Sequence, residues 1–351
     1  MQKAAFDRRA ALLKDALRRK NLDSFLITKD VNVSYVSGFA GHDAAIIATH
    51  GKLFFIADSR YTEEAGDSVR GFKIRPAKMS LYEIIREIAA AQKLKKMGFE
   101  SADLSYEVAG RLKKFVAGAA LVPVKGLVED FRAIKDSGEI ALIRKSIRLA
   151  RDVLDGIIPF IKPGASEESL AGKIEIAFLT RGAKSGFDPI VAADANSSKP
   201  HAVPTARKIS KDSIVMVDIG CTFNKYNSDL TRMVTVGRVK PRMKKIYEIV
   251  RTAQAMAIDA IRPGARIAGI DAVARRYIQS KGFGRYFGHA LGHGIGMEVH
   301  EKPGISGVSE ETLRSGMVFT VEPAIYIPKV GGIRVEDMVL VTDKGCEVLS
   351  R

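Results

Sequence analysis

The stretch Ile214-Val-Met-Val-Asp-Ile-Gly220 places a carboxylate inside an apolar run that predicts a buried strand. After a turn, Tyr226-Asn-Ser-Asp-Leu-Thr-Arg232 carries another carboxylate. The same pattern recurs near the other end of the chain, where Met317-Val-Phe-Thr-Val-Glu-Pro323 precedes Gly332-Ile-Arg-Val-Glu-Asp337. Carboxylates enclosed among Val, Ile and Met lose hydration and repel one another unless a cation joins them. These two hairpins therefore indicate a metalloenzyme.

Asp218 and Asp229 of the first hairpin are neighbours in either of two registers. With a turn centred on residues 223–224 they are direct cross-strand partners, and with the turn shifted by one residue they are diagonal neighbours on one face. Like charges in such positions destabilise a sheet, and cations remove that penalty. The alternative is that the acids form buried salt bridges with Arg232 and Arg334. Two arginines cannot balance four carboxylates, so we favour the metal.

The histidines of the glycine-rich stretch 288–301 complete the candidate site. His289 and His293 have the i,i+4 spacing of a metal-binding helix, but the glycines around them make a helix improbable. We therefore place both on extended or irregular backbone that approaches a ligand closely. A lone histidine is usually a core residue, whereas four of the six histidines here fall in two loops: His201, His289, His293 and His300.

Four carboxylates and one histidine suit a pair of divalent ions. Carboxylate and imidazole donors without thiolate favour manganese, cobalt, iron or zinc. We expect two divalent ions per chain, with Mn²⁺ as the first choice and Co²⁺, Zn²⁺ or Fe²⁺ as alternatives. The four carboxylates are those of Asp218, Asp229, Glu322 and Glu336.

Composition places the chain among ordinary globular proteins of 351 residues, long enough for two domains. Two cysteines, Cys221 and Cys346, exclude a disulfide framework and indicate a reducing compartment. Cys221 follows the first carboxylate strand, and we interpret it as a small core residue in preference to a metal ligand.

No stretch has the ~20 apolar residues of a membrane span, and the charged N-terminus lacks a signal-peptide pattern. We expect a cytoplasmic protein without a membrane partner.

The net charge of +16 raises the question of nucleic acid. The lysines and arginines are spread along the chain with acids between them, and no arginine-rich tail occurs. A solvated basic surface is the favoured interpretation, and no specific nucleic-acid partner is expected.

Helical and strand patterns alternate through residues 1–127, which predicts a first α/β domain. Its apolar runs lack the glycine motifs of a nucleotide site. Residues 128–351 form the second domain, which contains an internal repeat, since Ile161–Ala165 (IKPGA) recurs as Ile261–Ala265 (IRPGA). In both copies a helix, a breaker, a second helix, a histidine loop and a carboxylate hairpin follow in the same order. We therefore expect two similar halves with the site at their junction. The strands expected in the first domain span 24–28, 44–48, 52–57, 98–100 and 121–124, and its clearest helix spans 80–94.

The motifs VMVDIGCTFNKYNSDLTR, FGHALGHGIGMEVHE, GMVFTVEPAIYIP and GGIRVEDMVLVT resemble, in order and spacing, the signature blocks of pita-bread metallopeptidases of the aminopeptidase P and prolidase branch. PHAVPT adds a fifth block, and DVNVSYVSGFAG with LFFIADSRYTEEA resembles the family's creatinase-type N-terminal domain. The resemblance covers nearly the whole chain. It implies an α/β (α+β) fold, with the N-terminal creatinase-type domain followed by a pseudo-symmetric pita-bread catalytic domain.

The resemblance also implies a role for each site residue. Asp229 and Glu336 would bridge the two ions, His289 would bind substrate, and Arg334 would steady the carboxylates. His201 and His300 would bind substrate and assist at the scissile bond, while Glu322 would relay a proton to the departing proline nitrogen. The implied metal ligands are Asp218, Asp229, His293, Glu322 and Glu336.

The implied reaction is hydrolysis of the bond before proline in peptides with proline second, by a chain that forms a homodimer. Several dipeptide-specific members carry arginine where this chain has Gly304, so the sequence favours an Xaa-Pro aminopeptidase that acts on longer peptides. An Xaa-Pro dipeptidase (prolidase) is the close alternative. A non-catalytic pita-bread module that binds nucleic acid or protein is the distant one, since such members typically lose ligands that are all present here.

Overall fold

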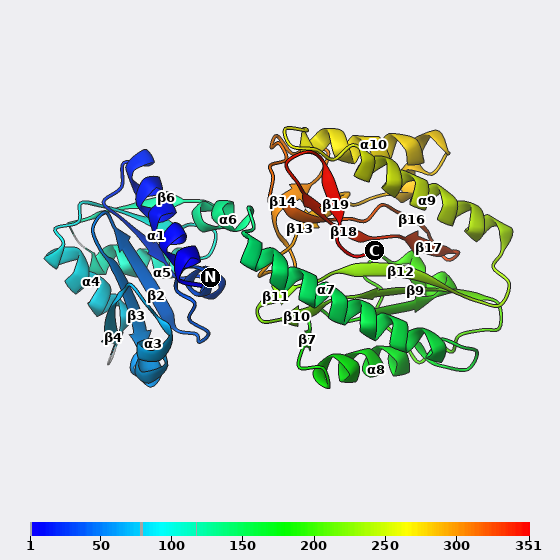
Figure 1. The fold of residues 1–351 in the computed structure, drawn as a ribbon, viewed down its shortest axis with the longest axis horizontal. Helices are drawn as coiled ribbons and strands as arrows, with labels where there is room; N and C mark the ends of the chain where they lie inside the picture. Colours follow the sequence, from blue (N-terminus) through cyan, green and yellow to red (C-terminus); the bar gives the residue numbers. More distant parts are fainter. Residues whose placement is uncertain (1, 78–79, 117) are drawn as a thin grey trace. The chain divides into compact units, whose positions relative to one another are not determined.

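The structure is a computed structural model that describes residues 2–77, 80–116 and 118–351 (Figure 1). The chain divides into two compact units, residues 1–132 and 133–351. Helices and strands alternate in both units, which confirms the expected α/β class. Within the described residues, no helix combines the length and the apolar character needed to cross a membrane.

The first unit is a six-stranded mixed sheet with helices from the same part of the chain. Its strand order is β4-β3-β2-β1-β5-β6, with β2 antiparallel to both neighbours and the outer pairs parallel. The side chains of Ser80 and Ser105 cap the helices that follow them. All five expected strands and the expected helix are confirmed. The elements are α1 (Gln2–Arg19), β1 (Ser24–Ile27), α2 (Asp30–Ser37), β2 (Ala44–Thr49), β3 (Leu53–Asp58), α3 (Thr62–Ser68), β4 (Lys73–Ala77), α4 (Leu81–Ala91), β5 (Lys96–Glu100), α5 (Tyr106–Phe115), β6 (Ala120–Val124) and α6 (Leu127–Arg132).

The second unit is built from two successive sets of elements. The first set comprises α7 (Ser137–Ile157), α8 (Glu167–Leu179), β7 (Lys184–Ser185), β8 (Ile190–Ala193), β9 (Ser213–Ile219), β10 (Cys221–Phe223), β11 (Tyr226–Asn227) and β12 (Leu230–Val236). The second set comprises α9 (Pro241–Asp259), α10 (Ile267–Ser280), β13 (Gly292–Gly294), β14 (Glu301–Ile305), β15 (Val318–Val321), β16 (Ala324–Ile327), β17 (Gly331–Arg334), β18 (Asp337–Val341) and β19 (Cys346–Val348).

The internal repeat is a structural repeat. In the first copy, residues 164–165 exchange backbone hydrogen bonds of 3.0 and 2.9 Å with Ile209. In the second copy, residues 264–265 make the equivalent bonds of 2.8 and 2.9 Å with Leu313. A single antiparallel bridge follows each turn, at Ser166–Lys208 and Arg266–Thr312. The same pattern of backbone hydrogen bonds therefore occurs twice, as the repeated IxPGA string predicted.

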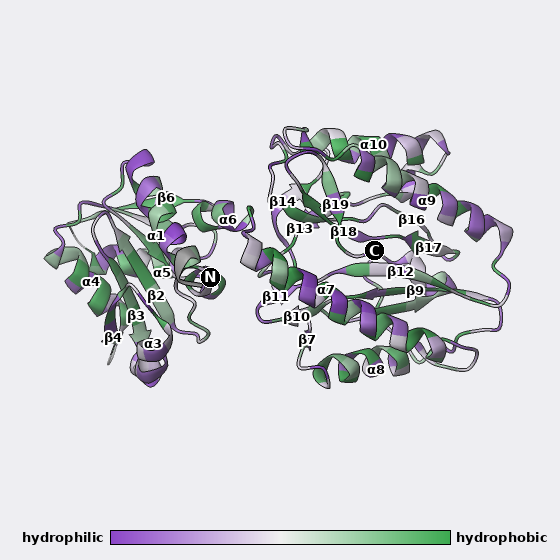
Figure 2. Ribbon diagram, viewed as in Figure 1, coloured by the Kyte–Doolittle hydropathy of each residue, from purple (hydrophilic) through white to green (hydrophobic). Residues whose placement is uncertain are grey.

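Each helix pair covers one face of a sheet, and the opposite face is left for the site. On β9, Val215, Val217 and Ile219 pack in one cluster with α7 and α8. Successive side chains of a strand point to opposite faces, so Met216 and Asp218 point away from those helices. In Figure 2, α7 alternates between hydrophilic and hydrophobic residues, as a helix packed on one side should. A second cluster joins α9 and α10 to β15 and β18.

Helix α7 begins with a complete capping box in which Asp136 and Glu139 bond each other's backbone N–H. It ends at Ile157 and passes into a short 3₁₀ turn, Ile158–Phe160. The helix ends before the Ile161–Ala165 repeat because Pro159 has no N–H with which to continue it.

Candidate metal centre

The first hairpin adopts the shifted register. Its turn is centred on Asn224 and Lys225, which both have positive φ, 46° and 71°. Strands β9 and β12 then pair Asp218 with Thr231, so Asp229 is the diagonal neighbour of Asp218 on the same face. The direct pairing of the two aspartates is therefore wrong. Both carboxylates nonetheless reach the same cavity.

The second hairpin brings its two glutamates to the same place. Glu322 directly follows β15, and Glu336 lies between β17 and β18. The side chain of Thr320, two residues before Glu322, donates to Glu322 Oε1 over 3.0 Å. It also accepts the backbone N–H of His293 at 3.1 Å, which joins the glutamate strand to the histidine strand β13.

A cavity of about 320 Å³ contains every residue that the sequence proposed for the site. Within it, His293 Nε2 lies 3.5 Å from Asp229 Oδ2 and 3.4 Å from Glu322 Oε1. Possible ligand atoms of Asp229, His293 and Glu336 all lie within 4.8 Å of one another. His289 is in a loop and His293 is on a strand, as the glycine content predicted. The nine predicted residues in the cavity lining are His201, Asp218, Asp229, His289, His293, His300, Glu322, Arg334 and Glu336.

The carboxylates cannot all be ionised in this cavity without help. Burial, followed by repulsion from Asp218 and Glu322, raises the pKa of Asp229 well above its ordinary value. Burial and then the charge of Asp229 do the same to the pKa of Glu336, and burial raises the pKa of Glu322. Asp218 Oδ1 is buried and has no hydrogen-bond partner in the described part of the chain. Divalent cations would satisfy this oxygen and remove the repulsion, so the donor set fits a metal centre.

Arg232 and Cys221, which the sequence offered as a salt-bridge partner and as a further ligand, do not line the cavity. Arg232 pairs with Asp337 instead, over 2.8 Å, so its predicted role in the salt-bridge alternative is wrong. Cys221 is buried outside the cavity lining, and its thiol contacts Ser146. Burial raises the pKa of that thiol, as expected for an inert core residue.

Arg334 is the arginine that does reach the acids. Its Nη2 donates to Asp218 Oδ2, and its Nη1 donates to the hydroxyl of Tyr326 and to the carbonyl of Pro200. Its Nε donates to Thr231 Oγ1 at 3.0 Å, and that hydroxyl donates to Glu336 Oε2 at 2.6 Å. One guanidinium therefore orients a carboxylate from each hairpin.

Sequence reasoning missed Tyr326 and the two threonines, Thr231 and Thr320. Burial raises the pKa of Tyr326 to about 12, so its phenol stays protonated near neutral pH. Each of these residues lies two or four positions from a predicted ligand along extended backbone. The period-2 alternation of strands was the signal that could have identified them.

Two histidines that line the cavity, His289 and His300, have lowered pKa values. Burial lowers the pKa of His289 to about 4, and burial with the nearby His293 lowers the pKa of His300. His289 Nδ1 donates to the carbonyl of Ala290 at 2.7 Å, which leaves Nε2 with the lone pair. That Nε2 is buried and has no partner in the structure as described. It is available to a substrate N–H or hydroxyl group.

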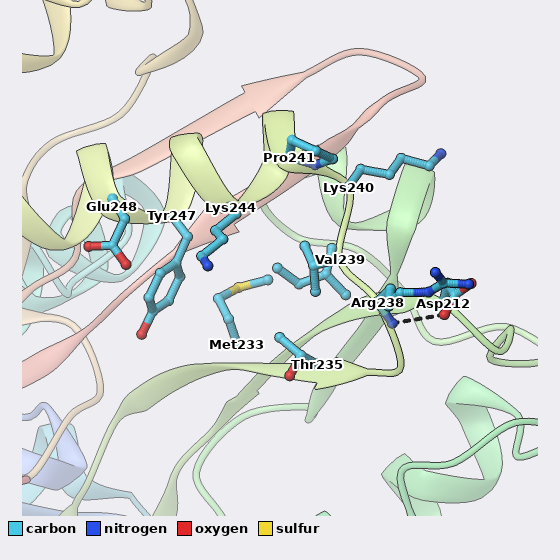
Figure 3. A pocket seen from close by; sticks show the side chains of 11 residues that line it. Asp212, Met233, Thr235, Arg238, Val239, Lys240, Pro241, Lys244, Tyr247 and Glu248 are labelled. Carbon is cyan, nitrogen blue, oxygen red and sulfur yellow. Dashed lines mark hydrogen bonds between the residues drawn. The ribbon is translucent and has the colours of Figure 1, made fainter.

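A larger cavity of about 830 Å³ lies elsewhere in the second unit, between β12 and the start of α9 (Figure 3). Its lining is mainly aliphatic and basic and includes Met233, Val239, Lys244 and Tyr247. It contains no histidine and no cluster of carboxylates. Size alone is therefore a poor guide here, and the chemistry resides in the smaller cavity.

Comparison with known proteins agrees with this site. Residues 141–343 match the family "Metallopeptidase family M24", and residues 9–134 match "Creatinase/Prolidase N-terminal domain". A relative from Pyrococcus horikoshii, an Xaa-Pro dipeptidase, is 36% identical over 95% of this chain and 94% of its own length.

Solved structures give the same result. An Xaa-Pro dipeptidase from Bacillus anthracis superposes with a TM-score of 0.96 at 34% identity, covering 99% of this chain and 98% of that one. An X-Pro aminopeptidase from Thermotoga maritima gives 0.88 at 32% identity, with 94% and 96% covered. The creatinase-type domain and the pita-bread catalytic domain expected from the resemblance are thereby confirmed.

Proposed function

Because the chain belongs to metallopeptidase family M24, we propose that it is a metal-dependent Xaa-Pro dipeptidase, which hydrolyses the bond before proline. The observation that carries the proposal is the buried cavity, which is lined by four carboxylates and His293 and includes an oxygen of Asp218 that has no hydrogen-bond partner among the described residues.

The relatives from P. horikoshii and B. anthracis favour the dipeptidase over the aminopeptidase expected from Gly304. The Xaa-Pro aminopeptidase is retained as the second candidate, supported by the T. maritima structure. The homodimer stays a prediction.

The residues that would hold two divalent ions are Asp218, Asp229, His293, Glu322 and Glu336. When bound, such ions lower the pKa of a coordinated water from 15.7 to roughly 7 and polarise a carbonyl oxygen. The metal itself is proposed to be manganese, and cobalt, zinc or iron(II) would suit the same donors.

The chain's own groups then supply positioning and proton transfer. Glu322 lines the cavity, so its carboxylate can accept the proton released during hydrolysis and deliver it to the departing proline nitrogen. His201 and His300 line the same cavity, where His300 can stabilise charge that develops on the scissile carbonyl. His289 Nε2 is free to bind the substrate. A dedicated site is needed because the bond before proline is a tertiary amide without an N–H.

A substrate panel separates the two candidates. We expect the manganese-loaded chain to hydrolyse Xaa-Pro dipeptides with a kcat/KM at least equal to that for the matching Xaa-Pro-Xaa tripeptides. The measurement is initial-rate kinetics on paired peptides that share the same first residue. A clear preference for the tripeptides would establish the aminopeptidase instead. Inactivity on both peptides, by a chain that retains two ions, would reject both candidates.

Gly304 provides a second test of the dipeptide preference. It pairs with His293 across β13 and β14, and a side chain added at this position would point into open space. A guanidinium there could bind the free carboxylate of a dipeptide. We expect Gly304→Arg to lower the KM for Xaa-Pro roughly 10-fold, which equals about 1.4 kcal/mol, with kcat little changed.

Gly304→Gln is the matched control, because it adds a side chain of similar reach without charge. It should leave the KM for dipeptides near that of the parent. Equal KM values for the two variants would show that the carboxylate of the substrate does not reach a side chain at position 304.

A further inference from the structure

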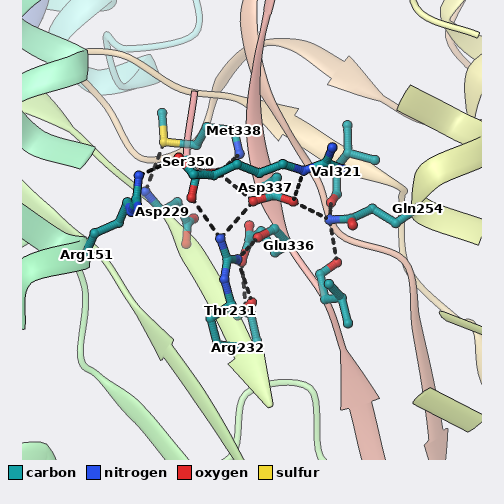
Figure 4. A network of polar contacts seen from close by, with 12 residues as sticks. Arg151, Asp229, Thr231, Arg232, Gln254, Val321, Glu336, Asp337, Met338 and Ser350 are labelled. Carbon is teal, nitrogen blue, oxygen red and sulfur yellow. Dashed lines mark hydrogen bonds and ion pairs between the residues drawn. The ribbon is translucent and has the colours of Figure 1, made fainter. Parts of the chain in front are cut away.

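Consecutive residues of β12 hold Glu336 from two sides. Thr231 and Arg232 leave opposite faces of the strand, as neighbours on extended backbone must. The hydroxyl of Thr231 donates to the Glu336 carboxylate, while Arg232 Nη1 donates to the Glu336 backbone carbonyl. Both ends of this expected metal ligand are therefore bound to the strand that follows Asp229 (Figure 4).

Arg232 uses all four N–H groups of its two terminal nitrogens. Nη1 donates to the carbonyls of Thr231, at 3.0 Å, and of Glu336. Nη2 donates to Asp337 Oδ1 at 2.8 Å and to the carbonyl of Ser350 at 2.9 Å. The planar guanidinium group of arginine can donate to four acceptors placed in this way, whereas lysine offers a single nitrogen.

The network continues from Asp337 to the second hairpin. Asp337 is buried, and its two oxygens accept the hydroxyl of Ser350, at 2.7 Å, and the amide of Gln254, at 3.2 Å. The Gln254 amide also donates to the carbonyls of Val321 and Val335, each at 3.2 Å. These two residues directly precede Glu322 and Glu336. The network thus fixes the backbone beside both glutamates.

We propose that Arg232 is a positioning residue that sets the separation between Asp229 and Glu336, and so decides whether the site holds two ions as a pair. The inference rests on the metal centre proposed above. Asp229 comes from the first hairpin and Glu336 from the second, and Arg232 joins the backbone of the two segments. Arg232 lies on the face of β12 opposite Thr231, so it acts through the ligand backbone and not on the substrate.

The test is metal binding by the full chain after metal removal, with Mn²⁺ as the probe. The variants are Arg232→Lys, which keeps the charge and loses the fork, and Arg232→Gln. Calorimetric titration measures affinity and stoichiometry, and electron paramagnetic resonance reports whether two Mn²⁺ ions are coupled. We expect the parent to bind two coupled ions. Both variants should bind the second ion about 10–100-fold more weakly and lose the coupled signal.

Arg144→Gln is the matched control. Arg144 forms a bidentate ion pair with Glu347 in the same unit, at 2.7 and 2.6 Å, and neither residue lines the cavity. This variant should keep the coupled Mn²⁺ signal of the parent.

Thermal unfolding of each variant separates positioning from general stability. Arg232 variants with a lowered Tm but a parental coupled signal in the folded protein would overturn the proposal. A parent chain that binds no Mn²⁺ would overturn the metal centre itself, whereas a parent that binds two ions with unchanged Arg232 variants would overturn this inference alone.

Discussion

Asp229→Ala should lower kcat/KM for Xaa-Pro peptides by about 1,000-fold or more, because metal-assisted hydrolysis loses several kcal/mol of stabilisation and each 1.4 kcal/mol is a factor of ten. Asp229 is 5% exposed, and its Oδ2 lies 3.5 Å from His293 Nε2. Its removal takes a negative charge from the centre of the donor set. The metal content should fall from two ions per chain, as measured by elemental analysis of the purified protein.

The control for this variant is Asp152→Ala. Asp152 is an exposed carboxylate on α7, so its loss should leave both metal content and kinetics unchanged. Two ions per chain and near-parental activity in Asp229→Ala would contradict the proposed ligand set. Asp229→Asn adds a further comparison, since it preserves the shape of the side chain and removes only the charge.

The gathering of the candidate ligands in one cavity was predictable because carboxylates are unusual inside apolar strands. Asp218 interrupts a run of Val, Ile and Met, and the structure shows this strand buried along its whole length. A buried carboxylate without a partner is costly, so its presence in the sequence pointed to a ligand. The IxPGA repeat predicted two similar halves for a related reason, since the same string produced the same backbone hydrogen bonds twice.

The register of the first hairpin was not predictable from composition. A turn centred on Asn224 and Lys225 requires positive φ at both residues, and lysine gives no signal for that conformation. A shift of one residue changes which side chains are direct partners. It placed Thr231, and not Asp229, opposite Asp218.

The partner of Arg232 was missed for a geometric reason. Its neighbour Thr231 faces the acids, so alternation along β12 turns the guanidinium away from them and toward Asp337. A count of charges in the sequence assigned this arginine to the cavity. The face of the strand from which a side chain projects determines which charged groups it can contact.

Removal of the metal should destabilise the second unit strongly near neutral pH and much less in acid. Burial raises the pKa values of Asp229, Glu322 and Glu336 in the metal-free fold. A carboxyl whose pKa is higher in the folded than in the unfolded chain contributes stability while it is protonated. That contribution is lost as the pH rises from the unfolded pKa through the folded pKa. Metal binding requires the ionised form, so the stabilisation by metal grows over the same range.

The magnitude follows from mass action. Free Mn²⁺ at about 1,000 times its Kd stabilises the folded state by about 4 kcal/mol per site. At roughly 2–4 °C per kcal/mol for a unit of this size, the Tm should rise by roughly 8–16 °C for one ion. Scanning calorimetry of the metal-stripped and manganese-loaded chain at about pH 5 and about pH 7.5 measures the difference, since carboxyls with raised pKa values are more fully ionised at the higher pH.

Glu322→Gln gives the sharpest control, because it removes one titrating carboxyl and one ligand at once. Replacing a buried charge by a neutral group of the same shape should raise the Tm of the metal-free chain near neutral pH. The same variant should lose most of the increase caused by Mn²⁺. A parent Tm that rises with pH in the absence of metal, or an equal metal effect at both pH values, would show that these carboxyls are not held together in the way the cavity indicates.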